Sequence, residues 1–369
     1  MVGNRTRGSN HVGVTRALSG IGLAAVAVAA VVVTGHDVRP EACLSGVLQY
    51  SSPDAERGTD LPVTTAPARR VDWELVEQQS SGPVVVHRGQ TDSADGSWRA
   101  CAPEGPSRSM TFRSASALTR VTVVSDADGE EFTYGTEATT SSKDFGDVVV
   151  GDDHDPSQAW RIVDTLGVLY GRRSTGTPDC WTESMCDPLV VRWAPKPGPD
   201  ASYFDEATGE VILGHTDVQS RHVILHEAGH WFQSHLAEGG GLPEVVGCEK
   251  HSTPTATTPT CAWTEGFAVA VAAHLLGDTR HVFDDGDSID TGGVGEMADW
   301  DDGDTVEGRV AGSLLDIWDR VDGGDWTSTV EILGEPIEDF HAYVDARIER
   351  DPAQKDEILA ILAQHTIDY

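Results

Sequence analysis

The sequence predicts an α+β protein: a small β-sandwich over residues 43–150, then a mostly helical domain over residues 151–369 that also carries a small sheet. Short apolar segments between turn residues fill the first region, and no long helical pattern interrupts them. From Gln158 onward, apolar residues recur at helical spacing instead. The chain of 369 residues is long enough for two domains, each with a sizeable core.

Residues 1–35 have the composition of an export signal. They contain three Arg residues and no acids, and residues 17–35 carry no charge. The apolar core, residues 18–33, would span about 24 Å as a helix, which is short of the ~30 Å hydrocarbon core of a bilayer. We therefore expect a signal peptide, with an uncleaved signal anchor as the alternative because no clear Ala-x-Ala cleavage site directly precedes His36. In both cases the remaining chain is expected to be secreted or extracytoplasmic.

Residues 43–150 carry the signals of short strands joined by turns. Residues 71–75 alternate apolar and acidic side chains, which predicts a strand with one buried face, and residues 120–124 predict another. Residues 45–47 (Ser-Gly-Val), 91–92 (Thr-Asp) and 95–98 (Asp-Gly-Ser-Trp) resemble the transthyretin-like modules of some secreted peptidases. That resemblance implies a spacer, a folding aid or a binding surface.

Residues 151–369 show mainly helical patterns. Residues 158–170 carry one broad apolar face. Further helices are expected near residues 306–321, 337–349 and 352–365. This half of the chain also holds the segments that predict a chemical function.

The segment from His226 to His230, His-Glu-Ala-Gly-His, has the spacing of a metal site on a helix. Residues four apart lie on the same helix face, so two imidazoles can bind one ion at about 2.0–2.1 Å per Zn–N bond. Glu227 is placed to take a proton from a water at such an ion. Gly229 lowers helix propensity by about 1 kcal/mol, which close approach of a second backbone or of substrate would explain. The alternative is a helix that carries histidines by chance.

His222 extends this row of histidines by one turn. His222 and His230 lie about 12 Å apart along a helix, so they cannot share one ion. A site made by His222 and His226 would place Val223 where the general base belongs. We therefore disfavour His222 as a ligand.

Residues 263–276 predict a second helix that would bring Glu265 to the same site. The segment is rich in Ala, has apolar residues at helical spacing and ends at Gly277. A buried carboxylate is costly unless it is paired, and metal ligation would pair it. The alternative is a first-turn Glu that the helix dipole favours.

Together, His-Glu-x-x-His at residues 226–230 and Trp-Thr-Glu-Gly-Phe-Ala at residues 263–268 resemble the gluzincin branch of zinc metallopeptidases. The resemblance covers roughly residues 205–275 and implies a zincin-like catalytic domain. It implies His226, His230 and Glu265 as zinc ligands. It also implies Glu227 as the general base.

Departures from the family pattern narrow the expected activity. His230 and Glu265 are separated by 34 residues, and no Gly-x-Met-Glu-Asn segment is present to bind a substrate amino terminus. Val269 stands where other gluzincins often carry an acid, and no Tyr or His stands out as a transition-state donor. The sequence thus predicts a secreted zinc peptidase, with an endopeptidase favoured. An aminopeptidase and an exported, non-catalytic binding protein with a degenerate zincin domain are the alternatives.

Residues 210–214 follow a turn signal at residues 205–209 and are expected to form a short strand. By the same resemblance, this would be the edge strand beside the active-site helix, where an extended peptide can pair with it. The alternative is a strand without a role in binding.

The chain has a formal net charge of −34, from 60 acidic and 26 basic residues. This charge repels nucleic acid and anionic membranes, so we expect a peptide or protein substrate and no membrane contact beyond an N-terminal anchor. The acidic stretch at residues 284–304 raises Ca²⁺ as a second cofactor. It lacks the EF-hand spacing, however, and a solvated loop is the favoured interpretation.

All six cysteines follow the export segment, which suits disulfides in an oxidising compartment. Neighbours in the sequence would pair as Cys43–Cys101, Cys180–Cys186 and Cys248–Cys261, although other pairings stay open. The last bridge would close the loop at residues 252–260 and help to position Glu265 against the histidines. A second zinc site is disfavoured because no Cys-x-x-Cys occurs.

Overall fold

The computed structural model describes residues 40–172, 188–196, 198–236, 241–293, 295, 297–335 and 337–369. The stretch Pro40–Tyr369 forms one compact unit. The expected export segment and the expected Cys180–Cys186 bridge lie outside the described residues. Within those ranges, no helix combines the length and apolar character needed to cross a membrane.

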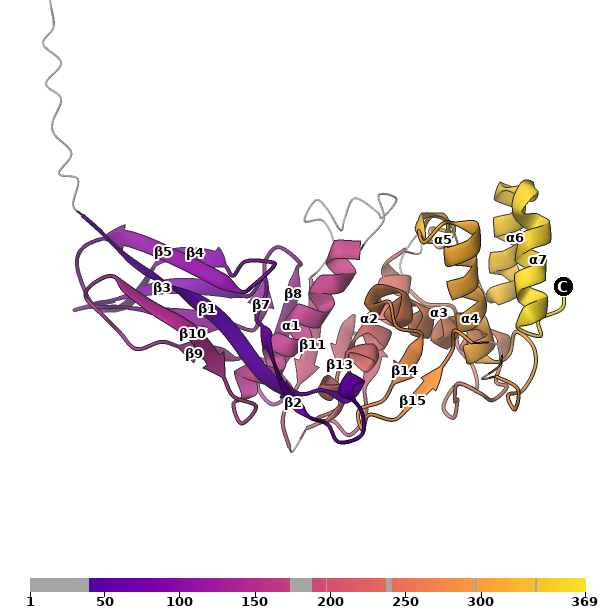
Figure 1. Ribbon diagram of the computed structural model, residues 1–369, viewed down its shortest axis with the longest axis horizontal. Helices are drawn as coiled ribbons and strands as arrows, with labels where there is room; N and C mark the ends of the chain where they lie inside the picture. The colour runs from indigo at the N-terminus through magenta and orange to yellow at the C-terminus, as the bar shows by residue number, and fades with distance from the viewer. Residues whose placement is uncertain are drawn as a thin grey trace, which may run out of the picture. The chain divides into compact units, whose positions relative to one another are not determined.

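Two four-stranded sheets make up most of the first part of the unit (Figure 1). One sheet contains β1 (Glu41–Pro53), β2 (Val63–Pro67), β5 (Ser97–Pro103) and β10 (Lys143–Val150). The other runs in the order β4 (Gly82–Gln90), β3 (Asp72–Gln79), β6 (Arg108–Arg113) and β9 (Thr133–Gly135). The predicted alternation appears in β3, where Trp73 and Leu75 are buried.

Ring packing joins the two sheets, and a disulfide links two neighbouring strands of one of them. The Trp98 ring of β5 meets the Phe112 ring of β6 edge-on at 5.3 Å, which brings the sheets into contact. Cys43 of β1 and Cys101 of β5 are direct partners in the strand register and form a disulfide, the pairing expected from the sequence.

A third, five-stranded sheet leads to the candidate site. Its order is β12 (Tyr203–Asp205), β13 (Glu210–Ile212), β11 (Leu189–Trp193), β8 (Val121–Ser125) and β7 (Ala115–Ser116). Strand β11 pairs in parallel with β8, so the sheet takes strands from both sides of the division expected at residue 150. The division into residues 43–150 and 151–369 stays a prediction.

The prediction that residues 210–214 form the edge strand is wrong. The strand in the segment 210–214 is β13, Glu210–Ile212, and it lies inside the sheet between β11 and β12. The edge is β12, which pairs antiparallel with β13 across the turn at residues 205–209. The sequence did not reveal β12, because a strand of three residues is too short to show an alternation of apolar and polar side chains.

Helices follow in an order close to the predicted one. They are α1 (Asp155–Arg172), α2 (Arg221–Leu236), α3 (Pro259–Leu276), α4 (Glu307–Asp316), α5 (Thr327–Ile332), α6 (Phe340–Arg350) and α7 (Lys355–Gln364). Short helical turns are η1 (Ala55–Arg57), η3 (Asp217–Gln219), the π segment η4 (Ile317–Val321) and η5 (Pro352–Gln354). A hairpin of β14 (Arg280–Val282) and β15 (Ser288–Asp290) follows α3.

Helix α3 begins four residues earlier than predicted. Thr258 caps its N-terminus by accepting from the Cys261 N–H at 3.3 Å, and Pro259 occupies the first turn. Glu265 therefore lies in the second turn, and the interpretation that it is a first-turn Glu favoured by the helix dipole is wrong. The helix ends at Gly277, which is left-handed with a φ of 65°, as the sequence predicted.

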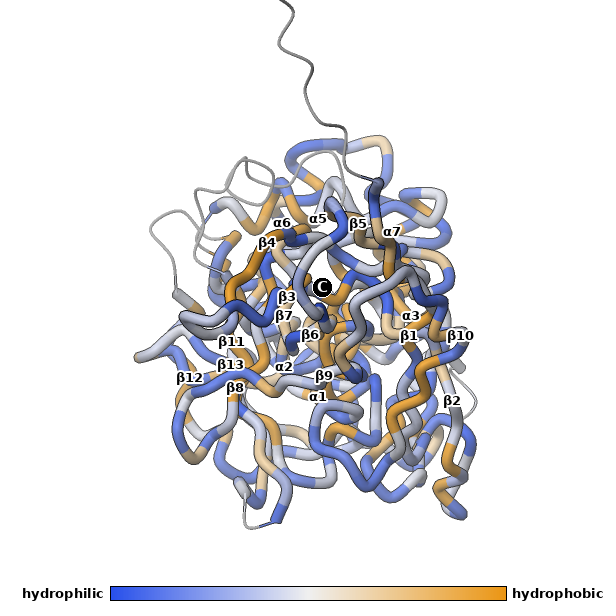
Figure 2. Tube along the Cα trace, turned by 90° about the vertical axis from the view of Figure 1, so that its left-hand side faces the viewer, coloured by the Kyte–Doolittle hydropathy of each residue, from blue (hydrophilic) through white to orange (hydrophobic). Residues whose placement is uncertain are grey.

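One hydrophobic core runs through the unit, from Leu44 of β1 to Ile367 beyond α7. Figure 2 shows hydrophobic stretches within the strands and helices and hydrophilic ones along the outer loops. The central helix α3 is buried on nearly all sides, which explains why its apolar residues show so little preference for one face.

Candidate active site

Helix α2 presents His226 and His230 one turn apart on the same face. Their Nε2 atoms lie 3.2 Å from each other. His230 is buried and His226 nearly so, with 13% of its side chain exposed. The two ring nitrogens therefore face a common point.

Glu265 of α3 completes a triangle with these two nitrogens. Its Oε2 atom lies 3.1 Å from His226 Nε2 and 3.3 Å from His230 Nε2. Ligand atoms around a tetrahedral zinc ion, with bonds of about 2.0–2.2 Å, are roughly 3.3–3.5 Å apart. The three side chains predicted as ligands thus come together at close to the spacing of a zinc site, and their atoms form a potential metal cluster.

Gly229 allows α2 and α3 to approach each other at this point. A Cβ atom on Gly229 would lie 3.0 Å from the Cα and 3.2 Å from the Cβ of Ala268 in α3. The close approach of a second backbone, which the sequence suggested for this glycine, is present in the structure. It brings Glu265, three residues before Ala268, within reach of the histidines.

His226 and Glu265 at the triangle shift each other's pKa. Burial opposes the charged form of His226, but the carboxylates of Glu265 and Glu227 raise its pKa to about 9. Burial likewise opposes the charge of Glu265, and the two histidines nevertheless hold its pKa well below its usual range. The carboxylates thus favour a positive charge at this point.

Glu227 lies where two cavities meet. A cavity of about 270 Å³ extends past Ser202, Tyr203 and Phe204 at the edge strand. A second, of about 250 Å³, is lined by apolar residues that include Val223 and Phe283. His226, Glu227 and His251 line both cavities. Burial raises the pKa of Glu227.

His251 is a site residue that sequence reasoning missed. It lies on the loop between α2 and α3, and its Nδ1 is 2.8 Å from Oε2 of the buried Glu307 at the start of α4. The loop is fastened by the Cys248–Cys261 disulfide, a pairing expected from the sequence. A histidine between two paired cysteines was the available signal. Only the fold shows that it faces the site.

Other residues considered from the sequence lie elsewhere. Both ring nitrogens of His222 face other groups: Nδ1 is 3.4 Å from Glu56 Oε1 and Nε2 is 3.3 Å from the Asp278 carbonyl oxygen. Arg309 of α4 is buried and donates to the Met297 and Asp301 carbonyl oxygens. Asp316 accepts from His365.

No acid among the described residues orients the two histidines. Their Nδ1 atoms are buried and have no hydrogen-bond partner in the part of the chain that the structure describes. Val269, which the sequence places where related enzymes often carry an acid, lines the second cavity.

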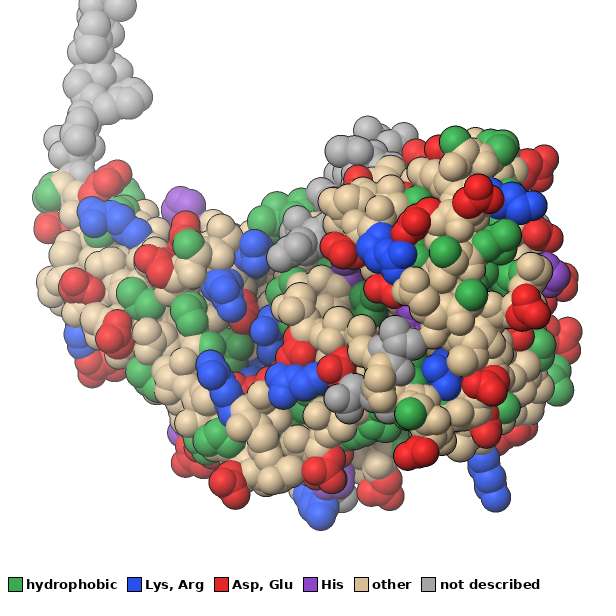
Figure 3. Space-filling model, turned by 45° about the vertical axis from the view of Figure 1, so that its right-hand side comes forward, with side chains coloured by type: hydrophobic (Ala, Val, Ile, Leu, Met, Phe, Trp, Pro, Cys, Tyr) green, Lys and Arg blue, Asp and Glu red, His purple; other side chains and the backbone are tan. Residues whose placement is uncertain are grey.

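The acidic stretch at residues 284–304 contributes to none of the potential metal clusters found among the described residues. The expectation of calcium therefore has no support. Figure 3 shows Asp and Glu spread over the visible face among fewer Lys and Arg side chains, in line with the net charge of −34.

Two family models match the chain. The mycolysin middle domain matches residues 43–161, and the mycolysin C-terminal domain matches residues 174–366, more than half of the chain. The chain belongs to the mycolysin family. Mycolysin membership points to a zinc metallopeptidase and to an extracellular location. The C-terminal match contains His226, His230, Glu265 and His251. No curated protein and no solved structure matches the chain.

Proposed function

We propose that this mycolysin-family chain is a secreted, zinc-dependent endopeptidase with a zincin-like catalytic arrangement. The observation that carries the proposal is the triangle of His226 Nε2, His230 Nε2 and Glu265 Oε2, with edges of 3.1 to 3.3 Å. The disulfides Cys43–Cys101 and Cys248–Cys261 support an oxidising compartment outside the cytoplasm.

His226, His230 and Glu265 would hold the ion, because two imidazoles and one carboxylate form a donor set typical of catalytic zinc. Zinc bound there would polarise a peptide carbonyl and lower the pKa of water. The buried Glu227 would take the proton of the attacking water and pass it to the leaving amine. Its place where the two cavities meet supports this role.

His251 is the residue we propose as the donor to the carbonyl oxygen during attack. Glu307 holds its Nδ1, which leaves Nε2 to face the cavities that His251 lines. The hydrogen bond to Glu307 raises the pKa of His251, which favours a hydrogen-bond donor on the ring. A preorganised donor of this kind stabilises negative charge that develops on the oxygen.

The edge strand β12 supports an extended peptide as substrate. Ser202, Tyr203 and Phe204 line the first cavity, and Tyr203 is 52% exposed. An edge strand can pair with a peptide backbone of any sequence. A second cavity beyond Glu227 leaves room for residues on both sides of the cleaved bond.

An aminopeptidase is less well supported. It needs a carboxylate to hold the amino terminus of the substrate. Among the described residues that line the two cavities, the carboxylates are Glu227, Glu265 and Glu307. The first is the proposed base, the second a proposed ligand, and the third is paired with His251.

The test compares wild-type protein with Glu227→Gln for zinc content and for cleavage of an unstructured protein. We expect one zinc per chain in both and a loss of about 10²- to 10⁴-fold in kcat for Glu227→Gln. The exposed Glu249 gives a control, since Glu249→Gln removes the same charge from the loop near the site and should keep full activity.

The absence of bound zinc in the wild type would overturn the proposal. Stoichiometric zinc without cleavage of any peptide would instead favour an exported, non-catalytic binding protein.

A further inference from the structure

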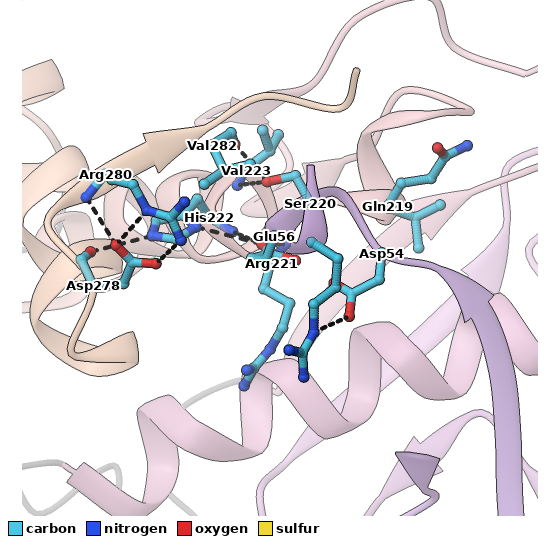
Figure 4. Close-up of polar contacts among 12 residues, drawn as sticks. Asp54, Glu56, Gln219, Ser220, Arg221, His222, Val223, Asp278, Arg280 and Val282 are labelled. Carbon is cyan, nitrogen blue, oxygen red and sulfur yellow. Dashed lines mark hydrogen bonds and ion pairs between the residues drawn. The ribbon is translucent and has the colours of Figure 1, made fainter. Parts of the chain in front are cut away.

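A turn from the first part of the chain contacts the N-terminus of the candidate active-site helix. The turn is η1 (Ala55–Arg57), which follows β1 and lies within the mycolysin middle-domain match. Figure 4 shows Glu56 from this turn beside Arg221 and His222 of α2. Glu56 Oε1 accepts from the backbone N–H of Arg221 and from that of His222, the latter at 3.2 Å.

These contacts cap α2 from outside the helix. The first N–H groups of a helix have no partner within it and carry partial positive charge, so an acid there is stabilising. The Ser220 hydroxyl, directly before α2, accepts from the Val223 N–H at 3.1 Å. Glu56 takes the two preceding donors. The start of the helix thus depends on a carboxylate located more than 160 residues earlier in the chain.

Glu56 is itself held by a buried arginine. Arg161 of α1 has 4% of its side chain exposed, and its Nη2 lies 3.0 Å from Glu56 Oε2. The same guanidinium donates to the Val218 and Gln219 carbonyl oxygens just before α2. Because these bonds fix the guanidinium, the carboxylate has little freedom to move away from α2.

A row of rings connects this cap to the ligand triangle. His222 Nδ1 lies 3.4 Å from Glu56 Oε1, and His222 is buried. Its ring meets His281 edge-on at 6.3 Å, and His281 meets His226 at 5.5 Å. His222 also precedes His226 by one turn of the same helix. The cap therefore contacts the first proposed ligand both along α2 and through packed rings.

We infer that Glu56 is a positioning residue for the metal site: by clamping the start of α2 it fixes where His226 and His230 stand relative to Glu265. The inference rests on the proposed function. It makes the middle-domain part of the chain a component of the catalytic unit. The sequence suggested that this part of the chain is a spacer, a folding aid or a binding surface. None of these roles predicts a contact with the candidate active-site helix.

The experiment uses the full chain and compares Glu56→Ala with a matched control, Glu77→Ala. Glu77 of β3 is similarly buried, with 12% of its side chain exposed against 16% for Glu56, and it pairs with buried Arg108 at 2.7 Å. Its contacts lie within the β-sheets, away from α2. Zinc affinity is measured by competition with a chelator, alongside Tm, kcat and KM.

We expect Glu56→Ala to weaken zinc binding about 10- to 100-fold, as loss of a residue that supports metal ligands does. It should lower kcat and leave KM nearly unchanged, because Glu56 does not line either cavity. Glu77→Ala should lower Tm and leave zinc affinity and kcat at wild-type values.

Equal falls in Tm for the two variants, with wild-type zinc affinity and kcat in both, would overturn the inference and leave the proposed function intact. A wild type that binds no zinc would overturn the proposed function itself. If Glu56→Ala does not fold, Glu56→Gln replaces it, since Gln keeps an acceptor oxygen and loses the charge. Wild-type zinc affinity and kcat in that variant would also overturn the inference.

Discussion

At the scale of single residues, the site contains two buried charges, Glu307 and Arg161, and each is held in a specific pair. His251 pairs with Glu307, and Glu56 pairs with Arg161. A buried charge without a partner is costly, so Glu307 and Arg161 each hold the partner side chain in one orientation. Fixed orientation is what a catalytic site requires, because its donors must already point toward the reacting atoms.

Replacement of His251 tests the proposed donor. His251→Ala should lower kcat by about 10²- to 10³-fold, the usual effect of removing one hydrogen-bond donor to a developing oxyanion. Zinc content should not change, because His251 is outside the ligand triangle. Glu307→Gln keeps an acceptor for Nδ1 and loses the charge, so its kcat should fall less. Wild-type kcat in His251→Ala would show that another group is the donor.

Acid titration tests the charge on Glu56. Burial alone would raise its pKa, but the hydrogen bond from His222 and the charge of Arg161 lower it from 4.5 to about 2. Asp54 also faces this pair, through Arg161. A lowered pKa means that the charge stabilises the folded state above pH 4.5 and that this stabilisation is lost as the pH falls toward 2.

The measurement is the free energy of unfolding in urea for wild type and Glu56→Gln from pH 7 to pH 2. The wild type should be more stable at pH 7, by up to about 3 kcal/mol. The difference should shrink between pH 4.5 and about pH 2. A difference that stays constant over this interval would mean that the charge of Glu56 does not stabilise the fold.

At the scale of elements, the site depends on how closely α2 and α3 approach. The ligands come from two helices, so the spacing of the helices sets the size of the triangle. Gly229 and Ala268, both small, form the contact. Larger side chains there would push the helices apart, since packed interiors yield little.

Gly229→Ala should therefore destabilise the protein by about 1–3 kcal/mol and weaken zinc binding, although alanine has the higher helix propensity. Gly167 of α1 provides the control. A Cβ there would meet only the side chain of Arg70, at 3.1 Å, and the end of an arginine can move. Gly167→Ala should keep zinc affinity. The stability of each variant is measured by thermal unfolding and its zinc affinity by chelator competition. Equal zinc affinity in the two variants would contradict the prediction.

At the scale of the whole molecule, one core joins the sheets to the helices. Leu48, Trp160 and Phe267 belong to the same buried cluster, although they come from β1, α1 and α3. A continuous core favours cooperative unfolding, in which stabilisation at one place reaches the others. Binding at the ligand triangle should thus stabilise the distant sheets as well.

Zinc at 100 times its Kd should raise the free energy of unfolding by about 2.7 kcal/mol. We expect that gain to appear in the hydrogen-exchange protection of amides in β3 as well as in α2. EDTA should remove it from both. Protection of β3 that does not respond to zinc would mean that the sheets unfold independently of the candidate site.

The sequence alone determined the local features, since each depends on neighbours along the chain. The row from His226 to His230, the helix that carries it and the end of α3 at Gly277 all follow from helix periodicity and backbone conformation. Spacing on one element is enough to predict them.

Only the tertiary structure decided which distant residues meet. The edge strand is β12 because of strand order, which three residues cannot reveal. His251 faces the site because Glu307, 56 residues later, holds it there. Glu56 reaches α2 across 165 residues. Such contacts depend on how elements pack, and packing brings together residues that share no periodic signal in the sequence.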